Sequence, residues 1–155
     1  PEAVRKLGGI GIGEQINLPL GGKGSRLDRG PLNLKVELLS HSSGHFELEN
    51  KQSHLASMCG DFFEMGPCAV VQGGGVIILL TTNKTAPFDL GQWRSQGINP
   101  EELSVIVVKA AVAHRAAYDP ITARSFTVDS PGPCSSDLSR LPYRRVRRPI
   151  YPLDD

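Results

Sequence analysis

The sequence predicts an α+β or mixed α/β fold, with β-hairpins followed by strand–helix–strand units around a mixed sheet. Residues 32–38 alternate apolar and polar side chains, the period of a strand with one solvated face. Residues 104–109 are an apolar run that leads directly into helix-forming residues at 110–118, a pattern typical of a buried strand followed by a helix. A further strand is predicted at 125–128, and the Pro-punctuated residues 131–155 are predicted to form an extended tail.

The chain is predicted to begin with a short helix and an edge strand. Residues 1–7 have the composition of the end of a helix. Residues 15–20 show short apolar alternation, which indicates a strand. Pro19 has no amide to donate to a neighbour, so this strand is expected at an edge of the sheet or to end there.

Two hairpins are predicted next. The first pairs residues 32–38 with 45–48 through a Ser-Ser-Gly turn at 42–44. The second pairs residues 68–72 with 76–82 through three consecutive glycines. Because the strand at 76–82 is apolar on both faces, it is expected near the centre of the sheet.

Two helix-start signals follow the hairpins. Asp89, with Gln92 three residues later, predicts the N-cap of a short helix that Gly97 ends. Asn99 followed by Pro100 repeats the signal, because Pro favours the first position of a helix.

Length and composition set broad limits. The 155 residues fit one domain, and the net charge of +1 gives no global argument for a nucleic-acid or membrane partner. The longest apolar run, residues 76–80, is far shorter than a membrane span. Three cysteines without CxxC spacing argue against a disulfide framework and favour the reducing cytoplasm. The abrupt start inside a helix leads us to expect part of a longer protein.

Most motifs that would define a site fail. The glycine-rich opening has Glu14 where a dinucleotide-binding loop needs its third glycine. Lys23 lies in a second glycine-rich loop without the Ser or Thr of a P-loop, although its ammonium could reach a ligand anion. No HExxH or nucleophile-elbow motif is present, so the cysteines are interpreted as small buried thiols. The histidine cluster, predicted to lie on a hairpin or at the surface, comprises His41, His45 and His54.

Lys109 is the stronger candidate for a site residue. It stands where the predicted strand 104–109 meets the predicted helix 110–118. Such junctions hold ligands in α/β sheets, and a helix N-terminus favours anions. Lys109 and the amides that follow could hold a substrate carboxylate. The alternative is a lysine at a strand end that only extends its ammonium into solvent.

The tail concentrates positive charge. Its arginines could form a nucleic-acid patch. Large apolar residues interleave them, however, so packing along a protein surface is favoured, with the guanidinium groups paired to carboxylates or carbonyls. We therefore predict neither a nucleic-acid nor a membrane partner. The arginines are Arg140, Arg144, Arg145, Arg147 and Arg148.

Several short segments together resemble one known family. In this order and spacing the sequence is similar, essentially end to end, to the C-terminal domain of the microcystinase C (MlrC) family of zinc metallopeptidases. The segments are Gly11-Ile12-Gly13, Leu20-Gly21-Gly22-Lys23, Met65-Gly66-Pro67, Pro87-Phe88-Asp89, Gly97-Ile98-Asn99-Pro100, Val107-Val108-Lys109, Arg115-Ala116-Ala117-Tyr118, Asp129-Ser130-Pro131-Gly132, the run 137–145 and the run 147–154.

The resemblance implies that residues 1–155 are a single C-terminal domain of a two-domain zinc hydrolase that cleaves amide bonds in small peptides. The metal ligands would belong to an N-terminal domain, which is the expected partner together with a small peptide substrate; a homo-oligomer is left open. This chain would wall the substrate cleft, with Lys109, Arg115 and Lys23 holding a carboxylate or the peptide backbone. Zinc is expected in the full-length protein and not in this chain, which alone should have no peptidase activity. The alternative is a binding or assembly module that keeps the fold without catalysis.

Two departures from the family pattern bear on activity. The family His-Phe-Arg falls on Ala113, His114 and Arg115, so only the arginine persists. Thr82-Asn83-Lys84 stands where the family tends to have Ser-Arg-Arg. The resemblance therefore implies altered specificity or reduced activity.

Overall fold

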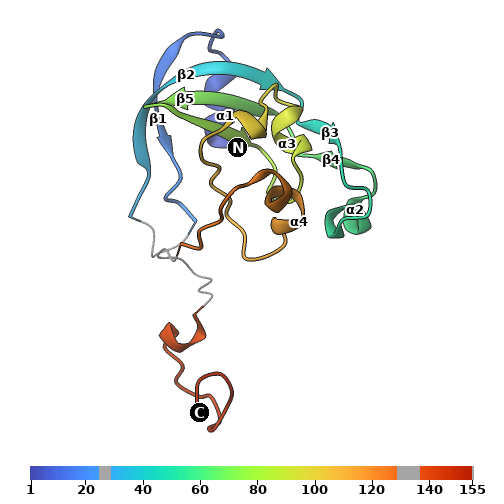
Figure 1. Ribbon diagram of the computed structural model, residues 1–155. Helices are drawn as coiled ribbons and strands as arrows, with labels where there is room; N and C mark the ends of the chain where they lie inside the picture. Colours follow the sequence, from blue (N-terminus) through green and yellow to red (C-terminus); the bar gives the residue numbers. More distant parts are fainter. Residues whose placement is uncertain (25–28, 129–136, 155) are drawn as a thin grey trace. The chain divides into compact units, whose positions relative to one another are not determined.

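The structure is a computed structural model that describes residues 1–24, 29–128 and 137–154 (Figure 1). It separates into two compact units. The first comprises Pro1–Leu20 and Asn33–Ser125, and the second comprises Gly21–Leu32 and Phe126–Asp155. That residues 1–155 form one domain stays a prediction.

The first unit is built on a four-stranded antiparallel sheet in the order β1-β2-β5-β6. These strands are β1 (Gln15–Leu20), β2 (Leu32–Ser42), β5 (Cys68–Gly73) and β6 (Val76–Thr81). A second, smaller sheet pairs β3 (His45–Glu47) with β4 (Phe62–Glu64). The predicted α+β class is confirmed, and β1 with Pro19 lies at an edge as predicted.

The helices are short. They are α1 (Glu2–Leu7), α2 (His54–Cys59), α3 (Gly91–Arg94) and α4 (Arg115–Tyr118), with 3₁₀ turns at Pro100–Glu102, Asp119–Ile121 and Leu138–Arg140. Ser53 caps α2 by accepting a hydrogen bond from the amide of Ala56 at 3.1 Å. Among the described residues, no helix has the length and apolar character needed to cross a membrane.

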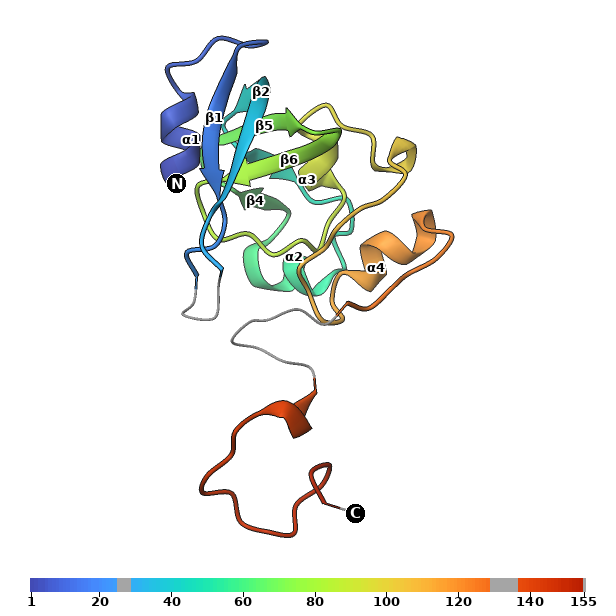
Figure 2. The ribbon, with the colours of Figure 1, turned by 90° about the vertical axis from the view of Figure 1, so that its left-hand side faces the viewer.

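Two apolar clusters form the core. In the first, α1 contacts β1, β5 and β6, and Figure 2 shows it alongside the sheet. Its buried members are Leu7, Leu18, Val36, Leu38, Ala69 and Val71. The second cluster joins the small sheet to α2 through Phe46, Leu48, Leu55, Ala56, Met65 and Cys68. Each large aliphatic side chain buried in this way stabilises the fold by about 1.5–3 kcal/mol.

The first predicted hairpin is wrong, because the chain leaves the main sheet at Gly44. This glycine has a φ of 75°, and a Cβ there would lie 2.0 Å from the carbonyl oxygen of Gly66. The amide of Met65 donates to the carbonyl of Gly44 at 2.9 Å. This close approach directs β3 to β4 instead of β2, and His45 stands opposite Glu64.

The second predicted hairpin is confirmed, since β5 and β6 pair antiparallel from Cys68↔Thr81 to Gly73↔Val76. The expectation that its second strand is central is wrong. β5 has neighbours on both sides and is buried, whereas β6 is the edge strand and is mostly half-buried. Apolar residues on both faces of β6 therefore did not indicate a central position.

The strands predicted at 104–109 and 125–128 are not formed. Val105 and Val107 are 78% and 88% exposed, and Phe126, in the second unit, is 82% exposed. A strand needs a neighbour for its backbone groups, and no described residue pairs with either segment. The predicted helix at 110–118 contracts to α4, and the Asn99–Pro100 signal produces a single 3₁₀ turn.

The described part of the tail, in the second unit, is mostly irregular. Its 3₁₀ turn is capped by Asp137, whose carboxylate accepts from the amide of Ser139 at 3.1 Å. Arg148 forms an ion pair with Asp154, which is the kind of arginine–carboxylate pairing predicted for the tail. The amide of Ile150 donates to the same carboxylate at 2.8 Å and holds the pKa of Asp154 below its usual value. Packing of the tail along a surface stays a prediction.

Candidate functional site

An open cavity of about 680 Å³ lies in the first unit. Two segments line it, residues 84–88 and 109–113. Most of the lining side chains are apolar, and each segment begins with a lysine, Lys84 in one and Lys109 in the other. An apolar lining with a few polar groups is the composition found in small-molecule sites, and this cavity is largely open to solvent.

Hydrogen bonds to neighbouring elements hold the first wall, residues 84–88, in place. Just before it, the amide of Asn83 donates to the carbonyl of Met65 at 2.8 Å. In the middle, the side-chain amide of Gln92 donates to the carbonyl of Ala86 at 2.6 Å. At its end, Phe88 packs against the second core cluster. The wall is therefore anchored to the small sheet and to α3.

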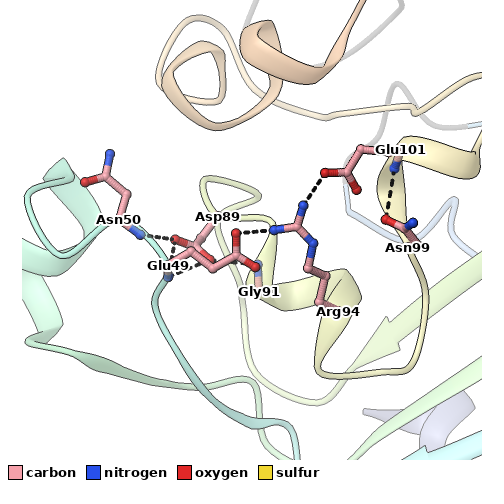
Figure 3. A network of polar contacts seen from close by, with 7 residues as sticks. All are labelled: Glu49, Asn50, Asp89, Gly91, Arg94, Asn99 and Glu101. Atoms are coloured by element: carbon pink, nitrogen blue, oxygen red, sulfur yellow. Dashed lines mark hydrogen bonds and ion pairs between the residues drawn. The ribbon is translucent and has the colours of Figure 1, made fainter.

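Asp89 fixes the end of this wall (Figure 3). Its side chain is 1% exposed and accepts hydrogen bonds from three backbone amides, those of Gly91 at 2.8 Å, Glu49 at 3.1 Å and Asn50 at 3.3 Å. A buried carboxylate is tolerated when donors satisfy it in this way. The prediction of Asp89 as the N-cap of a helix ended by Gly97 is wrong in its bounds, because the N-cap of α3 is Leu90 and the helix ends at Arg94. Asp89 instead accepts from the first amide of α3, that of Gly91, and ties residues 49–50 to the cavity wall.

Arg94 forms a second, more exposed link in the same region (Figure 3). Its guanidinium pairs with Glu49 and with Glu101, which stands in the 3₁₀ turn before the second wall. The hydrogen bond to Glu49 is the main cause that raises the pKa of Arg94. Because all three side chains are substantially exposed, such pairs typically contribute under about 1 kcal/mol each.

The second wall is attached to the fold mainly through α4. Tyr118 is the one buried residue between positions 103 and 125, at 3% exposed. Its hydroxyl accepts a hydrogen bond from the indole nitrogen of Trp93 in α3 at 3.0 Å. Burial is the main cause that raises the pKa of Tyr118. A single buried side chain thus anchors a stretch of more than twenty residues.

His114 follows directly on the cavity lining. Its ring lies 6.3 Å, centroid to centroid, from that of Tyr118. Its Nδ1 atom is buried and has no hydrogen-bond partner among the described residues. Burying a polar atom without a partner typically costs about 1–3 kcal/mol of stability. The His114 ring therefore places an unsatisfied nitrogen beside the cavity, within the part of the chain that the structure describes.

The predicted site residues separate in the structure. Lys109 lines the cavity. Arg115 begins α4 two residues after the last lining residue, Ala113, and is exposed. Lys23 belongs to the second unit and is not among the lining residues. Lys84 was not proposed from the sequence as a site residue. The only sequence signal at this position was that Thr82-Asn83-Lys84 stands where the family tends to have Ser-Arg-Arg.

The described residues do not provide a metal site. No group of three His, Cys, Asp or Glu side chains in residues 1–24, 29–128 and 137–154 could hold a metal ion. The three clustered histidines lie in β2, in β3 and at the start of α2, and His45 pairs with Glu64. Zinc therefore does not fit the described part of this chain, and no chemical step is assigned to a metal bound here.

Cys59 and Cys68 are free thiols, exposed and buried respectively, while Cys134 lies outside the described residues. Burial is the main cause that raises the pKa of the Cys68 thiol, and its Sγ donates to the carbonyl of Gly66 at 3.1 Å. A protonated, buried thiol is a poor nucleophile, which agrees with the prediction of a small buried thiol for Cys68. The same prediction is wrong for Cys59, which is exposed at the end of α2.

Comparison with known proteins identifies a matching family and a solved structure with a related fold. Residues 1–145 match the family described as MlrC C-terminus. In the crystal structure of a candidate metallopeptidase from Mesorhizobium sp. BNC1, a related fold covers 100% of this chain at 24% sequence identity, with a TM-score of 0.78. This chain spans 30% of that longer chain. No curated protein matches the sequence.

Proposed function

The chain belongs to the MlrC C-terminus family, and from this premise we propose that it forms the substrate-cleft domain of a zinc-dependent peptide hydrolase. The family match over residues 1–145 is the observation that carries the proposal. The catalytic metal, and the hydrolytic step itself, are assigned to an N-terminal domain of the same cytoplasmic protein. This chain contributes binding and orientation of a small peptide.

The cavity supports this role through its chemistry. Its apolar lining suits an aliphatic or aromatic side chain, which gains about 25 cal/mol for each Å² removed from water. Lys84 and Lys109 supply two positive charges for the carboxylate at the end of a short peptide. Arg115 is proposed to act at the periphery of the site, since it does not line the cavity.

Binding of short peptides to this chain tests the proposal. We expect acetylated apolar dipeptides with a free C-terminal carboxylate to bind about fivefold more tightly than their C-terminal amides, measured by calorimetry, since an exposed ion pair contributes up to about 1 kcal/mol. Lys109→Gln should reduce this preference, and the double variant Lys84→Gln/Lys109→Gln should remove it. Lys35→Gln changes an exposed lysine of β2 outside the cavity and should leave it unchanged. Equal binding of carboxylates and amides would contradict the proposal.

Hydrolysis is tested in a chimaera that joins this chain to the part of the Mesorhizobium protein that it does not cover. We expect cleavage of short apolar peptides that a chelator abolishes, with the intact Mesorhizobium protein as the positive control. A folded chimaera that binds peptides but does not cleave them, beside an active control, would favour the binding or assembly module.

A further inference from the structure

Residues 104–108, here called the unpaired segment, have the side chains of a strand but no neighbouring strand. Within the part of the chain that the structure describes, residues 104–111 neither donate nor accept a hydrogen bond. Val105 and Val107 are among the most exposed large apolar residues, while Ile106 and Val108 are half-buried. This alternation is the period of a strand with one face against its own fold and the other free.

Exposure of this kind is a liability in a protein that works alone. Exposed strand edges are normally protected by charges, prolines or bulges, because they otherwise pair with other chains. From Ser104 to Val108 there is no charge and no proline, and the first charge is Lys109. Val112, which lines the cavity, is exposed as well. Exposed apolar residues that are not protected in this way mark interaction sites when they form a patch.

The size of the related fold indicates the occupant. The Mesorhizobium chain is more than three times as long as this one, which covers 30% of it. Most of that protein therefore consists of structure that this chain lacks and that could supply a strand. A polypeptide strand is the ligand that matches unpaired backbone amides and carbonyls together with alternate apolar side chains.

We propose that residues 104–108 add as a β-strand to the edge of a sheet in the remaining part of the full-length protein. The inference rests on the proposed function and names the surface through which the two parts join. Since residues 109–113 line the cavity, pairing along 104–108 brings the partner sheet to its rim beside Lys109. The junction of the two parts then closes one side of the substrate cleft.

Hydrogen exchange in the chimaera tests the proposal. We expect the amides of residues 105–108 to exchange rapidly in this chain alone and at least about a hundredfold more slowly in the chimaera. The amides of Ala69, Val70 and Val71 in β5 should be protected in both and serve as the internal reference. Rapid exchange of residues 105–108 in a folded chimaera would overturn the proposal.

Two matched variants test whether the protection depends on residues 104–108 or is lost when a charge is added at any exposed valine. Val107→Lys should abolish the protection in the chimaera, whereas Val128→Lys, at a similarly exposed valine, should not. Neither should alter peptide binding to this chain alone, so failure of the docking surface is distinguishable from failure of the proposed function. Protection that rises with the concentration of this chain alone and is lost in Val107→Lys would identify a second copy as the occupant and overturn the proposal.

If the chimaera does not fold, the intact Mesorhizobium protein provides a second measurement. We expect slow exchange in its segment that aligns with residues 104–108 and, in its structure, pairing of that segment with a strand from the part this chain does not cover. Rapid exchange, or pairing within the covered part, would overturn the proposal.

Discussion

The strand β5 and the unpaired segment have similar side chains and opposite environments. Residues 69–71 of β5 are an Ala-Val-Val run that is almost completely buried, whereas Val105 and Val107 lie largely in solvent. The difference is the neighbours, since β5 lies between β2 and β6 and no described strand flanks residues 104–108. An apolar β-branched run therefore indicates a preference for extended structure, and burial depends on whether a partner exists within the same chain.

Truncation of one apolar side chain in each region should give the largest contrast. We expect Leu38→Ala, in the first core cluster, to lower the free energy of unfolding by about 2–5 kcal/mol because it leaves a cavity. Val107→Ala should change it by less than about 0.5 kcal/mol, since the side chain is already exposed. Denaturant unfolding of the two variants measures both values. A similar loss in both would mean that residues 104–108 are already packed in this chain.

Removal of the carboxylate that fixes the first cavity wall should have a smaller effect. We expect Asp89→Ala to cost about 1–3 kcal/mol, because three backbone amides lose their acceptor in a buried position. Asp61→Ala is the matched control, since that carboxylate is exposed and lies 3.9 Å from the ammonium of Lys51. The same denaturation assay compares them, and equal losses would contradict the role assigned to Asp89. Asp89→Ala should also weaken peptide binding, whereas Asp61→Ala should not.

The smallest expected effect concerns Tyr118, which anchors the stretch between positions 103 and 125. Its pKa is raised in the folded state, so its contribution is fully present below the unfolded value near 10 and is lost as the pH rises through the folded value. We expect stability to fall on going from pH 8 to pH 11. Tyr118→Phe should make this fall shallower and cost about 1 kcal/mol at pH 7, by removing the partner of Trp93.

Tyr143→Phe, at a partly exposed tyrosine in the second unit, is the control for the pH dependence. Its thermal unfolding curves from pH 8 to pH 11 should match those of the wild type. Cys68, whose pKa is also raised by burial, contributes a loss of the same sign, and it is present in all three proteins. If the stability of Tyr118→Phe falls from pH 8 to pH 11 as steeply as that of the wild type, ionisation of the Tyr118 hydroxyl is not the cause of the fall.

Elements whose position depends on residues close together in the sequence were predictable. Three glycines identified the β5–β6 turn, and Pro19 placed its strand at an edge. The path at Gly44 was not predictable, because it depends on contact with Gly66, which is distant in sequence. The strand at 104–109 was predicted from its side chains alone, and side chains carry no information on whether a neighbour is present.

The candidate site was predictable only in part, for a related reason. Lys109 was found because it ends a conspicuous apolar run. Lys84 lies on the opposite wall, and only the folded chain brings its segment to the same cavity. Lys23 and Arg115 had comparable sequence signals and do not line it. Charge and local pattern identify residues that can bind an anion, whereas the three-dimensional path of the chain selects which of them share a cavity.

The departure of the chain at Gly44 also bears on the order of folding. β5 and β6 are joined by two residues and can meet within microseconds, whereas β2 reaches β5 only after residues 43–67 have been traversed. Closing that longer loop costs more chain entropy before any ladder contact is gained. We therefore expect the β5–β6 hairpin to form early, with φ-values in β5 and β6 above those in β2 and the small sheet. The late step would be the docking of β2, which completes the four-stranded sheet.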